Sequence, residues 1–226
     1  DITHNAKTFK NIPLSIPYKG FLRVVGEAII HKDDFQFIND NLPAGEKPYA
    51  NARNLVSGSV RQLDNKICAN RNVYFMPWDI LEGLDDECTS YRYEKLMYCV
   101  DIGFNCPNMI IYKYTPDNEQ LDSDIETLRQ RAIDAGIPID GLVVKYDSIE
   151  YSKQKGGTSH HNNDGIAFKF EDETEKTVLR EIEWSLGRTG QLTPVAIFDP
   201  VELEGTVITR ASVHNLSYLK DFDLNI

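Results

Sequence analysis

Short apolar runs separated by turn residues dominate the first three quarters of this chain, and long helical patterns are few. The runs whose residue types predict strands are 21–30, 73–80, 139–146 and 165–170. The segments whose charge and apolar spacing predict helices are 32–39, 51–63, 91–98 and 122–135. Residues 153–164 are rich in Gly, Ser, His and Asn and predict a loop. The pattern therefore favours an α+β fold.

The pattern changes near residue 174 to longer strands joined by tight glycine turns. The predicted strands are 178–186, 191–203 and 206–213, followed by a short helix at 214–220. They resemble consecutive strands of a small barrel, but three strands cannot close a five-stranded barrel. We therefore expect two domains, residues 1–172 and a truncated barrel at 173–226, whose open strand edges are available for self-association.

Charge and composition narrow the function classes. The 226 residues include 35 acidic and 24 basic side chains, a net charge of −11, which argues against a simple nucleic-acid binder but leaves room for a local basic cleft. No apolar run approaches the roughly 18 residues of a membrane helix, and no signal-peptide core is present. We expect no membrane association and a cytoplasmic protein, or a piece of one.

Cysteines do not indicate a metal site. Cys68, Cys88, Cys99 and Cys106 are too scattered for a CxxC-type zinc site, and the chain does not look like a short secreted disulfide scaffold. Reduced, mostly buried thiols are predicted, and no metal ligand is assigned in this chain.

Three predicted strands each place one charged residue among apolar neighbours: Glu27, Lys145 and Lys169. Such charges either lie on the solvent-exposed face of an antiparallel sheet or converge on a ligand. Composition alone favours the solvent-exposed face. Two lysines and one carboxylate suit a nucleotide, because the lysines neutralise phosphate charge and the acid accepts hydrogen bonds from ribose hydroxyls. The residues alone leave both interpretations open.

Arg53 and Arg61 fall on the same side of the helix predicted at 51–63. Arginines in that arrangement clamp phosphates bidentately or form surface ion pairs with the abundant acids. This pattern also leaves both interpretations open.

The residue order of several segments is more specific than their periodicity. Residues 51–64 contain Asn-Ala-Arg-Asn, Gly-Ser and Arg-Gln-Leu-Asp, and residues 140–145 read Asp-Gly-Leu-Val-Val-Lys. Together with the opening 1–14 and the stretch 187–215, they resemble the bacterial NAD-dependent DNA ligases, in the family's order and over nearly the whole chain.

The resemblance implies a fold and an activity. In that family a nucleotidyltransferase (adenylation) domain of two antiparallel sheets with flanking helices precedes an oligonucleotide-binding (OB) barrel. A lysine in a Lys-x-Asp-Gly motif attacks the adenylyl phosphorus of NAD and releases nicotinamide mononucleotide. The adenylate passes to the 5′-phosphate of a nick in duplex DNA, and the 3′-hydroxyl seals it. NAD as adenylyl donor, Mg²⁺ and nicked duplex DNA are thus the implied cofactors and partner.

The resemblance also carries over residue roles for binding the AMP moiety. Glu27 matches the acid that contacts the ribose, and Lys145 and Lys169 match the strand lysines that contact the nucleotide and its phosphate. Trp78 stands where the family usually has an aromatic residue, often Tyr, against the adenine; the exchange keeps a stacking surface and changes the polar edge.

Further matches concern the later steps. Arg53 and Arg61 match arginines important in the DNA-dependent steps, and Asp140 matches an acid of the same site. Arg131 matches another catalytic arginine, with an offset in spacing.

Two departures from the family pattern stand out. The chain contains no Lys-x-Asp-Gly, which the family places upstream of Asp1, so we expect it to hold AMP weakly and not to adenylylate itself. The family's usual Pro-Arg-Trp before the Lys169 strand is replaced by Asn162-Asn163-Asp164, and the neighbouring His160 and His161 are expected to be solvated loop residues.

Two other function classes share part of this pattern. An RNA-ligase or capping-type nucleotidyltransferase shares the Glu and the paired lysines, but not the 51–64 and 187–215 segments. A non-catalytic OB-type nucleic-acid-binding module is disfavoured by the acidic balance and the incomplete barrel. Preference for AMP over single-stranded nucleic acid separates an enzyme from a binding module.

Overall fold

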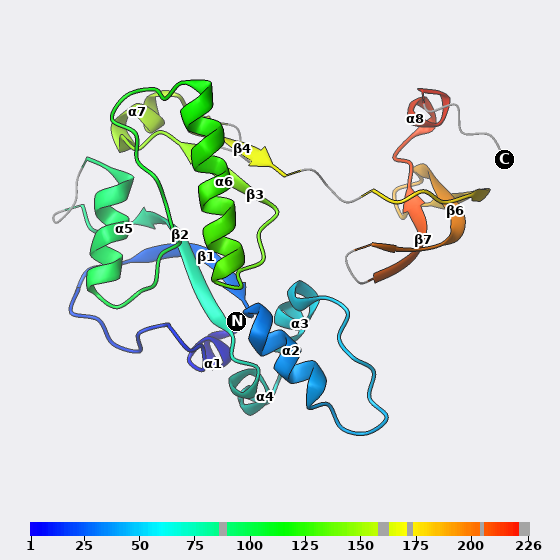
Figure 1. Cartoon of the computed structure of the whole chain (residues 1–226), viewed down its shortest axis with the longest axis horizontal. Coiled ribbons are helices and arrows are strands. Elements are labelled where there is room, and N and C mark those ends of the chain that lie inside the picture. The colour runs from blue at the N-terminus through cyan, green and yellow to red at the C-terminus, as the bar shows by residue number, and fades with distance from the viewer. Residues whose placement is uncertain (86–89, 158–162, 171–173, 204–205, 222–226) are drawn as a thin grey trace. The chain divides into compact units, whose positions relative to one another are not determined.

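The computed structural model describes residues 1–85, 90–157, 163–170, 174–203 and 206–221. The chain divides into two compact units, Asp1–Phe170 and Glu171–Ile226 (Figure 1).

The first unit contains two antiparallel two-stranded sheets and flanking helices. Its strands are β1 (Arg23–Ile29), β2 (Tyr74–Glu82), β3 (Gly141–Lys145) and β4 (Gly165–Lys169). Its helices are α1 (Thr3–Ala6), α2 (Lys32–Asp40), α3 (Ala52–Ser59), α4 (Asn65–Asn70), α5 (Arg92–Asp101), α6 (Asn118–Asp134) and α7 (Ile149–Gln154). The α+β class and the antiparallel sheets expected from the sequence are confirmed.

A β-bulge interrupts the β1–β2 ladder. Val25 faces Asp79 and Gly26 faces Pro77, so Trp78 is an extra residue on β2 without a partner on β1. At Gly26 a Cβ atom would lie 2.3 Å from the carbonyl oxygen of Met76, which only glycine tolerates. Bulges redirect the side chains around them, and this one lies next to a predicted site residue.

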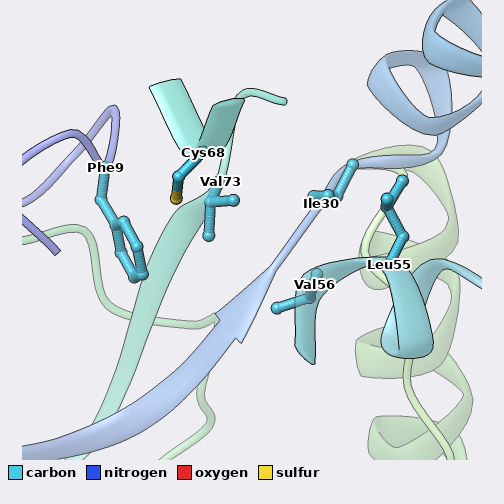
Figure 2. Close-up of a cluster of buried hydrophobic side chains, with 6 residues drawn as sticks. All are labelled: Phe9, Ile30, Leu55, Val56, Cys68 and Val73. Atoms are coloured by element: carbon cyan, nitrogen blue, oxygen red, sulfur yellow. The ribbon is translucent and has the colours of Figure 1, made fainter. Parts of the chain in front are cut away.

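Two apolar clusters fix helices to the β1–β2 sheet. Figure 2 shows the first, in which Ile30 after β1 lies near Leu55 and Val56 of α3, and Val73 before β2 lies next to Cys68 of α4. Its buried members are Phe9, Ile30, Leu55, Val56, Cys68 and Val73. The second cluster joins Ile80 of β2 to Leu96 and Cys99 of α5. Because these side chains are removed from water, α3 and α5 are held at defined places beside the sheet.

Helix α3 is shorter than predicted. It ends at Ser59, so Arg61 lies in the following turn and the prediction of one helix over 51–63 is wrong. Side chains satisfy the helix's last carbonyls: Arg61 Nε donates to Ser57 O at 2.9 Å and Gln62 Nε2 donates to Gly58 O at 3.2 Å. Asn5 Nδ2 donates to Val60 O at 2.8 Å and completes this C-terminal cap.

The other helices differ from prediction at their ends. Helix α6 begins at Asn118 rather than at 122, because the Asp117 carboxylate caps it by accepting from Gln120 N at 2.8 Å. Helix α7, capped by Ser148, includes Lys153, so the predicted loop at 153–164 starts later than expected. His160, His161 and Asn162 lie outside the described residues.

Three of the four cysteines lie in the described part of the chain. Cys68 is buried and free, and Cys99 is buried as well. Cys106 is free and half-buried, and burial raises the pKa of the Cys106 thiol to about 11. Cys88 lies outside the described residues. Among the residues described there is no cluster of His, Cys, Asp and Glu suited to a metal ion. None of the described helices is long and apolar enough to span a bilayer.

In its described residues, the second unit contains one antiparallel sheet and a short helix. Its elements are β5 (Leu179–Leu186), β6 (Leu192–Leu203), β7 (Thr206–Ser212) and α8 (Leu216–Asp221), with strand order β5-β6-β7. The three strands and the helix fall where the sequence predicts them. Within residues 174–203 and 206–221 the strands form no closed barrel.

Candidate functional site

Lys145, the last residue of β3, meets three side chains among the described residues: Trp78 and Asp79 of β2, and Asp164 just before β4. Its Nζ lies 3.0 Å from Asp79 Oδ2 and 3.9 Å from Asp164 Oδ2. The same ammonium stands 5.5 Å from the centre of the Trp78 ring. Trp78 and Asp79 are consecutive on β2, where a regular strand would point them to opposite faces. The bulge explains how both reach the same ammonium.

Arg92, the first residue of α5, completes this group. Its guanidinium donates through Nη1 to Asp79, at 2.7 Å from Oδ2 and 2.9 Å from Oδ1, and through Nη2 to Asp164 Oδ2. Two cations therefore face two carboxylates that are almost completely buried. We call Asp79, Arg92, Lys145 and Asp164 the buried ion cluster.

Sequence reasoning missed three members of the buried ion cluster. Asp164 was identified only as part of a departure from the family pattern, while Asp79 and Arg92 were not singled out. The available signals were weak: an acid beside Trp78 in a mostly apolar strand, and a basic residue at a helix start, where acids are more usual.

Among the described residues, Lys169, at the end of β4, has one charged partner, and that partner is exposed. Its Nζ lies 2.7 Å from Asp140 Oδ2, and the two side chains are 63% and 67% exposed. The hydrogen bond from Lys169 is the main reason why the pKa of Asp140 lies below its ordinary value; the charge of Arg53 adds to the same effect. Lys169 and Asp140 thus form an ion pair open to solvent.

Arg53 connects this pair to β1. Arg53 Nη2 lies 3.6 Å from Glu27 Oε1, and both side chains are largely exposed. The Asn51 side chain caps α3 by accepting from Arg53 N at 2.7 Å, which fixes the start of the helix that carries Arg53. Glu27, Arg53, Asp140 and Lys169 are therefore brought into one neighbourhood.

The β3–β4 ladder places both lysines on one face of the sheet. Lys145 stands opposite Gly165, and Lys169 stands opposite Gly141, with the pair Val143 and Ala167 between them. A Cβ atom at Gly165 would lie 2.5 Å from Val144 O and 2.8 Å from Lys145 Cγ. The face therefore presents an ammonium group near each end of a small apolar floor.

Two predicted residues are not brought into this neighbourhood by any contact among the described residues. Arg61 binds Ser57 through both its Nε and Nη2 atoms and lies against its own helix end. Arg131, in the last turn of α6, is exposed, and within the described residues its side chain makes no hydrogen bond or ion pair with a site residue.

The set of groups is complementary to a phosphorylated, ring-bearing ligand. Two lysines supply positive charge, Glu27 supplies hydrogen-bond acceptors, and the Trp78 ring is 47% exposed and offers a stacking surface. Val143 is exposed between the lysines and supplies apolar contact. A nucleotide combines these features, with a charged phosphate, hydroxyl groups and a flat base.

Comparisons with known proteins identify the family of both units. The family model described as the NAD-dependent DNA ligase adenylation domain matches residues 1–173, and the one described as the NAD-dependent DNA ligase OB-fold domain matches residues 176–226. The DNA ligase of Lachnoclostridium phytofermentans is 42% identical over 100% of this chain and 34% of its own length. Those of Ruminiclostridium cellulolyticum and Bacillus velezensis are 40% and 38% identical, again over 100% of this chain and 34% of the relative.

The fold and the family models thus define an α+β unit of the ligase adenylation type followed by a β unit of the OB type. The chain belongs to the NAD-dependent DNA ligase family. It spans about a third of the length of the curated relatives that it matches. Membership decides against the two alternative function classes, an RNA-ligase or capping-type nucleotidyltransferase and a non-catalytic OB-type nucleic-acid-binding module.

Proposed function

We propose that this chain is the nucleotide-holding part of an NAD-dependent DNA ligase, which seals nicks in duplex DNA through an enzyme-adenylate and a DNA-adenylate. The observation that carries the proposal is the β3–β4 face, where Lys145 and Lys169 flank an apolar floor beside Glu27 and Trp78. Family membership supports NAD as the donor of the adenylyl group.

Each site residue receives a role that its surroundings suit. The exposed ring of Trp78 stacks on the adenine, and the Glu27 carboxylate accepts hydrogen bonds from the ribose hydroxyls. Lys145 and Lys169 neutralise the phosphate. Asp140 holds the Lys169 ammonium at 2.7 Å until a phosphate takes its place.

The DNA-dependent steps involve the arginines and the second unit. Arg53 and, after it turns from Ser57, Arg61 bind phosphates of the nicked duplex. We place the adenylation domain at residues 1–172 and the OB-type region at 173–226. Mg²⁺ assists phosphoryl chemistry by neutralising developing charge in the complete enzyme.

Transfer of the adenylyl group to the protein requires a nucleophilic amine. In the family reaction a lysine nitrogen forms a bond to the adenylyl phosphorus of NAD, while the bond to nicotinamide mononucleotide breaks and that group leaves. The 226 residues include no Lys-x-Asp-Gly. We therefore expect this chain to bind AMP weakly and to remain unmodified by NAD.

Intact mass spectrometry after incubation with NAD and Mg²⁺ tests the proposal. The samples are this chain and a longer protein in which the chain is joined to a segment that supplies Lys-x-Asp-Gly. We expect an adenylyl adduct on the longer protein only, and Lys145→Met in it to slow adduct formation by at least about tenfold, the loss of one charge-assisted hydrogen bond.

Lys113→Met is the matched control, because Lys113 lies over Tyr114 and makes no contact with the site residues among the residues that the structure describes. Absence of an adduct from the longer protein, with NAD intact, would contradict the proposed function. An adduct on the 226-residue chain would show that a lysine outside the expected motif is the nucleophile.

A further inference from the structure

We infer that Arg92 is a positioning residue for Lys145, and that Asp164 is the partner through which it acts. The inference deepens the proposed function and rests on it. Asp164 is the third residue of the Asn162-Asn163-Asp164 departure, where the family usually has Trp. In this chain the position carries the carboxylate of Asp164, which accepts a hydrogen bond from Nη2 of Arg92.

Arg92 holds both buried carboxylates with one planar group. Nη1 contacts both oxygens of Asp79, and Nη2 contacts Asp164 Oδ2. The side chains of Asp79 and Asp164 are only 6% and 7% exposed, and that of Arg92 is 19% exposed. A guanidinium suits this task because its donors lie in a rigid fork, which an ammonium lacks.

Backbone hydrogen bonds fix the start of α5 against the chain that follows β3. Arg92 N donates to Asp147 O at 2.9 Å, and Ile149 N donates to Ser90 O at 3.0 Å. Tyr146 N donates to Asp164 O at 2.9 Å, next to Lys145. Arg92 and Lys145 are therefore tied to one another through the main chain as well as through the shared carboxylates.

Lys145 is the member of the buried ion cluster that is free to change partners. Its side chain is 29% exposed, more than those of the other three. When a phosphate approaches, Lys145 turns toward it, and Arg92 continues to neutralise Asp79 and Asp164. Without Arg92, Lys145 alone would balance two buried carboxylates, and their attraction would hold its ammonium back from the phosphate.

Binding of AMP and of adenosine separates this role from a general structural one, since adenosine has no phosphate. Both ligands are titrated calorimetrically into the longer protein that carries Lys-x-Asp-Gly. For Arg92→Gln we expect the Kd for AMP to rise about tenfold, the scale of one charge-assisted hydrogen bond, and the Kd for adenosine to stay within about twofold. Arg92→Lys keeps the charge without the fork, so we expect a smaller loss of AMP affinity.

A double variant tests the charge balance directly. Arg92→Gln with Asp164→Asn removes one positive and one negative charge, leaving Lys145 with Asp79 alone. We expect the Kd for AMP to return to within about threefold of wild type, because the excess carboxylate is gone. Arg23→Gln is the matched control, since Arg23 forms an exposed pair with Glu82 and its loss should change neither Kd.

The AMP and adenosine titrations distinguish the inference from a purely structural role of Arg92. Unchanged AMP affinity in Arg92→Gln overturns the inference and leaves the proposed function in place. Equal loss of AMP and adenosine affinity, without recovery in the double variant, assigns Arg92 a structural role only and also overturns it. If wild type binds neither ligand, the proposed function fails and the inference with it. Should Arg92→Gln not fold, as judged by circular dichroism, Arg92→Lys and the double variant carry the same comparison.

Discussion

The β3–β4 sheet carries a lysine near each of its ends, and the two lysines are held in different ways. Lys145 lies opposite Gly165 and shares two buried carboxylates with Arg92. Lys169 lies opposite Gly141 and meets only Asp140 among the described residues, in an exposed pair. The two positions are the same in residue type and strand register, but they differ in the burial of the partners.

That difference separates two uses of a positive charge. A buried cluster carries a desolvation cost, so each member depends on the others and removal of one leaves an uncompensated charge. An exposed pair is screened by water and salt and contributes little to stability. The Lys145 end is therefore held by buried partners, and the Lys169 end is held by a partner that is open to solvent.

The largest expected effect is on stability at the Lys145 end. Arg92→Gln should lower the free energy of unfolding of the first unit by about 3 kcal/mol, because two buried carboxylates lose their main partner. Asp140→Asn at the other end should lower it by less than about 1 kcal/mol. Urea unfolding followed by Trp78 fluorescence, in a Trp184→Phe background, measures the free energy of unfolding of both variants. Similar losses in the two variants would contradict the difference between the buried and the exposed end.

A smaller loss of stability is expected from a substitution at Gly165, the residue opposite Lys145. Gly165→Ala places a methyl group against Val144 O and Lys145 Cγ, so the sheet must shift, at a cost of about 1–3 kcal/mol. Gly58→Ala in α3 is the control, since its Cβ meets open space and alanine favours a helix. The same urea measurement applies, and a Gly165→Ala protein as stable as wild type would show that the strand spacing adapts freely.

The smallest effect concerns the pH dependence of the exposed pair. Because Lys169 lowers the pKa of Asp140 in the folded state, the stabilisation is present above the ordinary carboxyl pKa of about 4 and is lost as the pH falls through the lowered value. The advantage of wild type over Asp140→Asn should therefore be below about 1 kcal/mol at pH 7 and should disappear near pH 2.

The salt dependence of stability also distinguishes the exposed pair from the buried ion cluster. Addition of about 0.5 M NaCl at pH 7 should reduce the small Asp140 effect, because charges open to solvent are screened. The loss in Arg92→Gln should change much less under the same conditions. Equal salt dependence of the two would mean that the buried ion cluster is accessible to water.

Local pattern was sufficient for most of the strands and for the interior of the longer helices. Residues 21–30 and 165–170 yielded β1 and β4 because apolar and β-branched runs favour extended backbone. The end of α3 was missed because its cap comes from Asn5, far away in the sequence, and from side chains of the turn itself. Helix ends depend on such partners, so periodicity locates them poorly.

The sequence by itself determined the family, because several of its segments resemble motifs of the NAD-dependent DNA ligases. It also indicated the strands and the candidate lysines, because these depend on residue types at fixed local spacing. Only the tertiary structure decided what each lysine meets. Asp79 and Lys145 are 66 residues apart, and Arg92 and Asp164 are 72 apart, so no local period relates them. Their meeting depends on a β-bulge at Trp78 and on the docking of α5, which arise from packing between distant segments.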